Sequence, residues 1–193
     1  MPKKKKKPTN NQTASRKRNM RRGRNRGSAF ERDVCKRLSL WWSEGEKEDV
    51  FWRSTTSGAR ATQTGLGQYG DVCAIDPMGN ELLDHFVIEL KTGYVNNSLQ
   101  DMIDRPNGRK PSHWEQWITK CEEEVRKHST AKHFMIISRR KSRELIVLTN
   151  FNYVHFESRK GGLVWLYDDK YQYHLLGDFL VPDTKTIIQG KLC

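Results

Sequence analysis

The stretch that decides the fold lies at residues 70–91 and reads GDVCAIDPMGNELLDHFVIELK. Two short apolar runs, at residues 72–75 and 86–90, enclose turn-forming residues at 77–80. This pattern predicts a β-hairpin whose tight turn is centred near Asn80. Such a hairpin would be apolar along most of its length and charged at one end.

The predicted hairpin brings three charged side chains together. Asp71 would lie opposite Glu89, and Lys91 would share a face with Glu89 because side chains alternate along a strand. Two carboxylates this close repel each other unless a cation lies between them. The sequence therefore predicts a Mg²⁺ site, for which Mn²⁺ would substitute, because Mg²⁺ takes oxygen ligands and keeps positions for water and phosphate.

An acidic residue two places before a lysine is not distinctive by itself. Chance predicts roughly two such triplets in a chain of this composition, and the sequence has three, at residues 89–91, 168–170 and 183–185. The second is typical of a turn between apolar runs, and the third follows a proline. Only the triplet at 89–91 lies in an apolar strand with a Gly-Asp pair upstream.

This arrangement resembles the PD-(D/E)xK nuclease superfamily, with Gly70-Asp71 as the first half of the motif and Glu89-Leu90-Lys91 as the second. The flanks are similar to those of archaeal-type Holliday junction resolvases and their phage relatives. In those proteins an early Phe-Glu pair, an Arg-Ser pair and a Ser-Gly-rich loop precede the acidic hairpin. Here the same order is found in Phe30-Glu31, Arg53-Ser54 and Ser57-Gly58. The resemblance covers roughly residues 27–150 and is weaker for the resolvase branch, because the loop after Ser54 is longer than expected there.

The resemblance implies a metal-dependent DNA endonuclease and gives roles to several residues. Asp71, Glu89 and the backbone carbonyl of Leu90 would hold the metal, and Lys91 would orient the attacking water. Glu31 would be a third metal contact, through water. The alternative for Glu31 is a capping box with Ser28, at the start of a helix predicted over residues 28–43.

The loop from Ser54 to Gly70 contains hydroxyls, glycines and an arginine, which are the groups that bind phosphate. The alternative is a plain surface connection. The predicted DNA-binding residues are Arg53, Ser54, Ser57 and Arg60, to which the resemblance adds Gln116 from a helix predicted over residues 112–127.

The formal net charge of +12 is concentrated at the N-terminus. Residues 1–26 hold twelve cations and no acid, so the remainder is formally neutral. With little apolar surface to bury, this arm is predicted to be disordered and to bind DNA phosphates without reading sequence. A solubilising tail and a nuclear-import signal are the alternatives. No apolar segment follows the charges and no run is long enough to cross a membrane, which predicts a cytoplasmic, DNA-associated protein.

Four isolated cysteines exclude the usual zinc motifs and suggest no disulfide framework. The remaining patterns predict a strand at 50–53, an irregular loop at 92–111, and strands at 133–138 and 144–149. The expected fold is an α/β, restriction-endonuclease-like core at residues 27–150, with a mixed central sheet flanked by helices. Residues 151–193 would form an extension containing a short helix at 151–156 and a β-hairpin within 163–181, packed on the core.

Three functions compete at this stage. The first is a structure-selective endonuclease of resolvase type, expected to be a homodimer because symmetric nicking of a four-way junction needs two sites. The second is a nuclease of the same core with a restriction-like, repair or nicking target. The third is a non-catalytic nucleic-acid-binding protein whose strand carboxylates are ordinary surface charges.

Overall fold

The computed structural model describes residues 10–54, 69–94, 98–103, 110–151, 165–167 and 170–190. No helix in these ranges is long and apolar enough to cross a membrane. The helices are α1 (Asn10–Trp42), the 3-10 turn η1 (Pro77–Gly79), α3 (Asn80–His85), α4 (Gln100–Ile103), α5 (His113–Lys127), α6 (Leu176–Phe179) and α7 (Pro182–Ile188). The strands are β1 (Phe51–Arg53), β2 (Val72–Ala74), β3 (Phe86–Thr92), β4 (His133–Arg139), β5 (Leu145–Thr149), β6 (Trp165–Tyr167) and β7 (Tyr171–Leu175).

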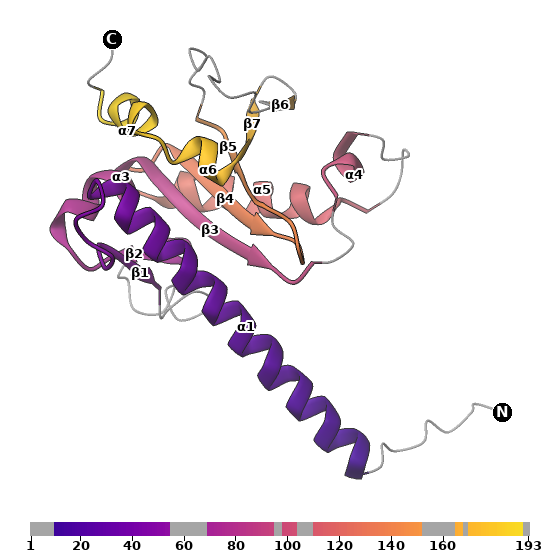
Figure 1. Ribbon diagram of the computed structural model, residues 1–193. Helices are drawn as coiled ribbons and strands as arrows, with labels where there is room; N and C mark the ends of the chain where they lie inside the picture. Colours follow the sequence, from indigo (N-terminus) through magenta and orange to yellow (C-terminus); the bar gives the residue numbers. More distant parts are fainter. Residues whose placement is uncertain are drawn as a thin grey trace.

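A mixed five-stranded sheet in the order β3-β4-β5-β7-β6 forms the centre of the protein. Strands β3 and β4 are parallel, and the other neighbours are antiparallel. β3 is therefore an edge strand of this sheet. A separate two-stranded ribbon of β1 and β2 lies beside it, next to α1 (Figure 1). The predicted α/β fold with a mixed sheet flanked by helices is confirmed.

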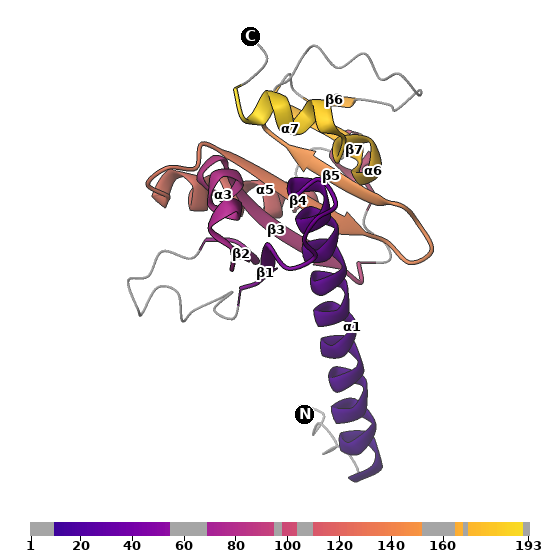
Figure 2. The same ribbon diagram turned by 60° about the vertical axis from the view of Figure 1, so that its left-hand side comes forward.

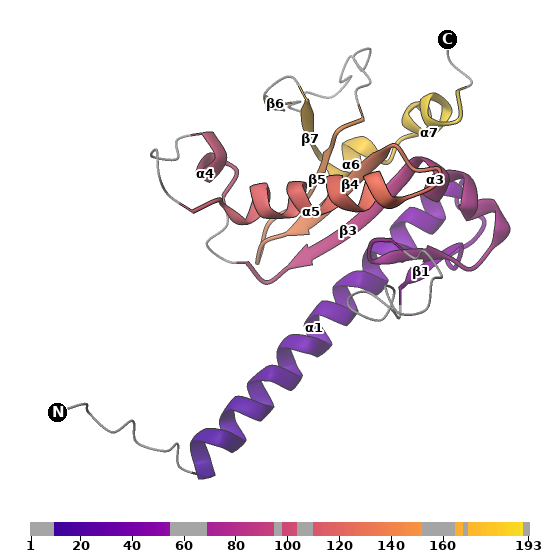
Figure 3. The ribbon, with the colours of Figure 1, turned by 180° about the vertical axis from the view of Figure 1, so that it is seen from behind.

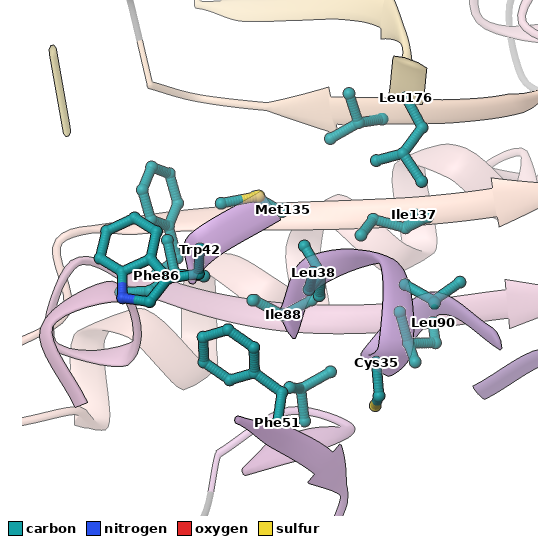
Figure 4. Close-up of a cluster of buried hydrophobic side chains, with 14 of the residues drawn as sticks. Cys35, Leu38, Trp42, Phe51, Phe86, Ile88, Leu90, Met135, Ile137 and Leu176 are labelled. Carbon is teal, nitrogen blue, oxygen red and sulfur yellow. The ribbon is translucent and has the colours of Figure 1, made fainter. Parts of the chain in front are cut away.

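The two faces of the sheet bury separate apolar clusters. One cluster packs α1, the β1–β2 ribbon, α6 and α7 against side chains that include Phe86, Ile88 and Met135 (Figure 4). The other packs α5 against side chains that include Val87 and Phe134. Helix α5 covers the face opposite α1, as the view from behind shows (Figure 3). Alternation along β3 therefore divides its side chains between two environments.

Helix α1 starts well before the predicted position. It includes residues 10–26, which we had expected to be a disordered arm, and these residues extend away from the sheet as a continuous helix (Figures 1 and 2). No proline interrupts this segment, and its arginines and lysines have high helix propensity, so charge did not prevent the helix. Because Ser28 lies inside α1, the predicted capping box with Glu31 is wrong.

The predicted tight hairpin is also wrong. β2 pairs with β1 rather than with β3, and η1 and α3 fill the connection between β2 and β3. The Asp76 side chain accepts a hydrogen bond from the Met78 N–H at 3.0 Å and caps this helical connection. Leu82 is fully buried and anchors α3. The Asp76-Pro77 pair is a helix-start signal that outweighed the turn signal.

Several other predicted elements agree with the structure. Strands β1, β4 and β5 match their predicted ranges within one or two residues, and α5 begins with the capping box of Ser112 and Glu115. Strands β6 and β7 form an antiparallel hairpin, and β7 extends the sheet by pairing with β5. The loop expected at 92–111 contains the short helix α4, and the helix expected at 151–156 falls mainly outside the described residues.

Candidate metal-dependent active site

Residues 70 and 71 run along the free edge of β3. The Asp71 N–H donates to the Ile88 carbonyl at 2.7 Å, and the Asp71 side chain accepts from the Leu90 N–H at 2.9 Å. Gly70 makes this approach possible. Its φ is +77°, and a Cβ at this position would lie 2.5 Å from the Ile88 carbonyl oxygen. Asp71 therefore lies beside Glu89 by edge pairing, without the predicted tight turn.

Glu89 is the centre of the charged cluster. Its side chain is 1 % exposed, and its Oε1 accepts from the Lys91 ammonium on the same face of β3. Oε1 also accepts from Lys120 Nζ of α5 at 2.7 Å. Lys120 in turn lies 3.4 Å from Glu124, one helical turn further along α5. The predicted common face of Glu89 and Lys91 is thus observed, and Lys120 is an additional member.

Two pKa shifts follow from this crowding. Burial, and then the charge of Glu89, raise the pKa of Asp71 to about 6, against the hydrogen bond from Leu90 and the charges of Lys91 and Lys120. Burial, the largest single influence, lowers the pKa of Lys120, but the hydrogen bond to Glu89 and the charges of the neighbouring carboxylates together outweigh it and raise this pKa above its usual range. Asp71 and Glu89 are therefore close enough to repel each other, as two ligands of one cation would.

The residues present fit a divalent cation. Glu89 Oε2 is buried and has no hydrogen-bond partner in the described part of the chain, which is costly for a carboxylate oxygen in a site without a cation. Carbonyls two residues apart on a strand point the same way, so the Leu90 carbonyl faces the same edge as that of Ile88, beside Asp71. These oxygens are the ligands that Mg²⁺ prefers.

The protein side chains alone do not complete a coordination shell. Within the described ranges, no three His, Cys, Asp or Glu side chains gather closely enough to hold a metal ion. The metal ligands available at this edge of the sheet are two carboxylates, one carbonyl and water. Mg²⁺ usually retains several waters, so such a sparse set suits it.

Glu31 lies near this cluster but has another partner. Its Oε2 is 3.4 Å from Arg53 Nη1, which also donates to the Ser28 hydroxyl at 3.2 Å. Burial, followed by the charges of Cys73, Glu31 and Asp71, raises the pKa of the Cys35 thiol to about 12, with Arg53 opposing. The charges of Glu31, Arg53 and Asp71 thus all act on one buried position of α1. The metal contact of Glu31 through water stays a prediction.

The predicted DNA-binding residues are placed differently. Ser54 is buried, and its N–H donates to the Asp71 carbonyl at 2.8 Å, so its backbone positions Asp71. Ser57 and Arg60 lie outside the described residues. Gln116 is exposed and donates to the Pro111 carbonyl at 2.8 Å. Their contacts with DNA, like that of half-exposed Arg53, stay predictions.

Lys120 was not among the residues predicted for the site, although its position in the sequence pointed to it. It lies four residues after Gln116, so both project from the same face of α5. Buried Trp117 and Cys121 hold α5 against the sheet and fix that face relative to β3. The helix residue that contacts Glu89 is therefore one turn further along than the residue that the resemblance suggested.

The Glu-x-Lys triplet on a strand of a mixed sheet, with an aspartate beside it, resembles the motif of PD-(D/E)xK nucleases. The profile of the family described as "Phage putative PDDEXK endonuclease" matches residues 22–185, and the chain belongs to this family. The predicted superfamily is thereby confirmed. No curated protein and no solved structure matched the chain.

Proposed function

We propose that this protein is a metal-dependent DNA endonuclease that selects branched DNA, in the manner of a Holliday junction resolvase. The observation that carries the proposal is the convergence of Asp71, buried Glu89 and Lys91 at the free edge of β3. Support for the branched substrate comes from the order of Phe30-Glu31 and Arg53-Ser54 before this site.

Each side chain has a defined task in hydrolysis of a phosphodiester. A divalent ion bound at this edge would polarise the scissile phosphate and lower the pKa of a bound water. Asp71, Glu89 Oε2 and the Leu90 carbonyl would hold that ion. Lys91 is 18 % exposed, so its ammonium is partly dehydrated and well placed to orient the water and offset developing negative charge.

The basic arm supplies affinity rather than specificity in this proposal. Its twelve cations would displace counterions from the phosphates of duplex arms flanking the site. A homodimer would place two sites on one junction and allow symmetric nicking. Sedimentation of the free protein and of its junction complex measures the oligomeric state directly.

The test is a cleavage panel with a four-way junction, a flap, a single strand and a linear duplex, each incubated with purified protein and Mg²⁺. The proposal expects cleavage that depends on the ion and is fastest on the junction. Fastest cleavage of the linear duplex would contradict junction selectivity. Absence of cleavage on every substrate, with DNA binding retained, would leave a non-catalytic binding protein.

Asp71→Asn separates catalysis from binding in the same panel. The variant keeps the acceptor for the Leu90 N–H but loses the charge, so we expect DNA binding at wild-type strength or tighter, without cleavage. Asp178→Asn, at an aspartate of α6 away from β3, is the matched control and should cleave like wild type. Equal cleavage by Asp71→Asn would refute the metal-binding role of Asp71.

A further inference from the structure

Lys120 makes the second of two ion pairs to the same oxygen of Glu89. Glu89 Oε1 already accepts from Lys91, two residues away on the same strand. Lys120 reaches the same oxygen from α5, although 49 % of its side chain is exposed to solvent. Because Glu89 is 1 % exposed and Lys91 already binds its Oε1, the half-exposed Lys120 is the cation of the two that can exchange this carboxylate for water or another anion.

The charges at the site explain why Lys120 binds there. Without a metal ion, the carboxylates of Asp71 and Glu89 are balanced by two ammonium groups. A divalent ion between the carboxylates makes this group of charges strongly positive. Lys120 and the ion then repel each other, and an anionic phosphate becomes the favoured partner for the ammonium.

The surroundings of Lys120 allow it to move. Lys91 is held by its own strand and is largely enclosed, whereas Lys120 lies at the solvent side of the cluster. Glu124, 3.4 Å away on α5, offers Lys120 a second partner when it leaves Glu89. One lysine can therefore stay on Glu89 while the other is released.

We propose that Lys120 is a second active-site cation with two successive partners. In the free protein it competes with the divalent ion for Glu89, and with the ion bound it contacts the scissile phosphate. This inference rests on the proposed nuclease function. It assigns to one lysine opposite effects on two measurable steps, because the same charge weakens ion binding and strengthens phosphate binding.

The first experiment measures Ca²⁺ binding to the full-length protein without DNA, by isothermal titration calorimetry. Lys120→Met keeps most of the side-chain volume and removes the charge. We expect it to bind Ca²⁺ about tenfold more tightly than wild type, the effect of removing one positive charge several ångströms from a divalent ion. Lys127→Met removes a lysine from the last turn of the same helix and should bind Ca²⁺ like wild type.

The second experiment measures junction cleavage at saturating Mg²⁺ with the same variants. Lys120→Met should cleave at least about tenfold more slowly, since a charge on the phosphate is lost. Lys120→Arg, which keeps the positive charge, should cleave at a rate between those of Lys120→Met and wild type. The control Lys127→Met should cleave at the wild-type rate. If Lys120→Met lowers the melting temperature, Lys120→Gln replaces it in both experiments.

Opposite changes in ion affinity and cleavage rate would support the inference. Unchanged or weaker Ca²⁺ binding by Lys120→Met would overturn the competition for Glu89, and unchanged cleavage would overturn the contact with phosphate. A wild-type protein that neither binds Ca²⁺ nor cleaves any DNA would refute the nuclease function itself, and this inference with it.

Discussion

Along β3, Phe86, Ile88 and Leu90 face α1, whereas Glu89 and Lys91 project toward α5. The first set packs in a continuous apolar cluster with α1 and the ribbon (Figure 4). The second set shares its face with apolar Val87 but places a fully buried carboxylate among cations. One seven-residue strand thus contributes to the apolar core on one face and to the proposed active site on the other.

The largest expected effect is on the charged face. Glu89→Gln keeps the shape of the side chain but removes the charge that would bind the ion, so cleavage per folded molecule should fall about a thousandfold. Junction cleavage with Mg²⁺, corrected for the folded fraction by circular dichroism, measures this. The control is Glu123→Gln, at an exposed position of α5. Equal cleavage rates for the two variants would contradict a catalytic role for the charged face of β3.

A substitution on the apolar face should have the converse effect. Ile88→Ala leaves a cavity between α1 and the sheet and should lower the free energy of unfolding by about 2–4 kcal/mol. Urea denaturation measures this loss. At a temperature where the variant is folded, its cleavage rate should stay within severalfold of wild type. A selective loss of cleavage with unchanged stability would show that the two faces are not separate in role.

Gly70 joins the ribbon to the charged face. Gly70→Ala introduces a Cβ at positive φ, against the Ile88 carbonyl, so residue 71 must move away from β3. We expect a loss of about 1–3 kcal/mol in stability and a larger relative loss of cleavage. Gly93→Ala is the control, because its φ is also positive but no atom lies near the added Cβ. Similar cleavage by both variants would argue against close packing of Asp71 on β3.

A smaller effect concerns pH. The pKa of Asp71 rises from 3.8 to about 6 on folding, so the folded protein retains a proton that the unfolded chain has lost between these pH values. Stability from Asp71 is therefore present below about pH 4 and lost as pH rises through 6. In metal-free buffer, Asp71→Asn should gain stability over wild type at pH 8, by up to about 3 kcal/mol, but not at pH 4. A difference that does not vary with pH would contradict the burial of this charge.

The smallest expected effect on cleavage comes from the basic N-terminal segment, which lies on neither face of β3. Removing residues 1–26 takes away twelve cations, so binding to any DNA should weaken and its salt dependence should flatten. Cleavage positions on the junction should stay the same. Fluorescence anisotropy at several salt concentrations gives the slope, and an unchanged slope would show that the arm does not bind phosphates.

Local sequence patterns predicted the sheet and the pairing of charges well. The strands at 133–138 and 144–149 are apolar runs of the right length, and the alternation of Glu89 and Lys91 is a property of any strand. The proximity of Asp71 to Glu89 was also expected, although the predicted hairpin was wrong. The charges therefore predicted that Asp71 and Glu89 are neighbours, but they did not predict the conformation of the chain between them.

Three further features were not predicted, one because two local signals competed and two because they depend on contacts between distant segments. The start of α1 depended on helix propensity in a segment whose charge suggested disorder. The connection before β3 became helical because Leu82 found a buried position. Lys120 joined the site only because α5 crosses β3 at that turn, 31 residues along the chain from Glu89. Long-range packing decided the last two of these features.

The most direct test of the central claim is an anomalous diffraction measurement on crystals of the protein soaked in Mn²⁺. The account predicts a manganese peak at the edge of β3, bonded to the Asp71 carboxylate and Glu89 Oε2, with Lys120 withdrawn from Glu89. A fully occupied peak elsewhere on the protein, or none at this edge with Glu89 still held by both lysines, would contradict it.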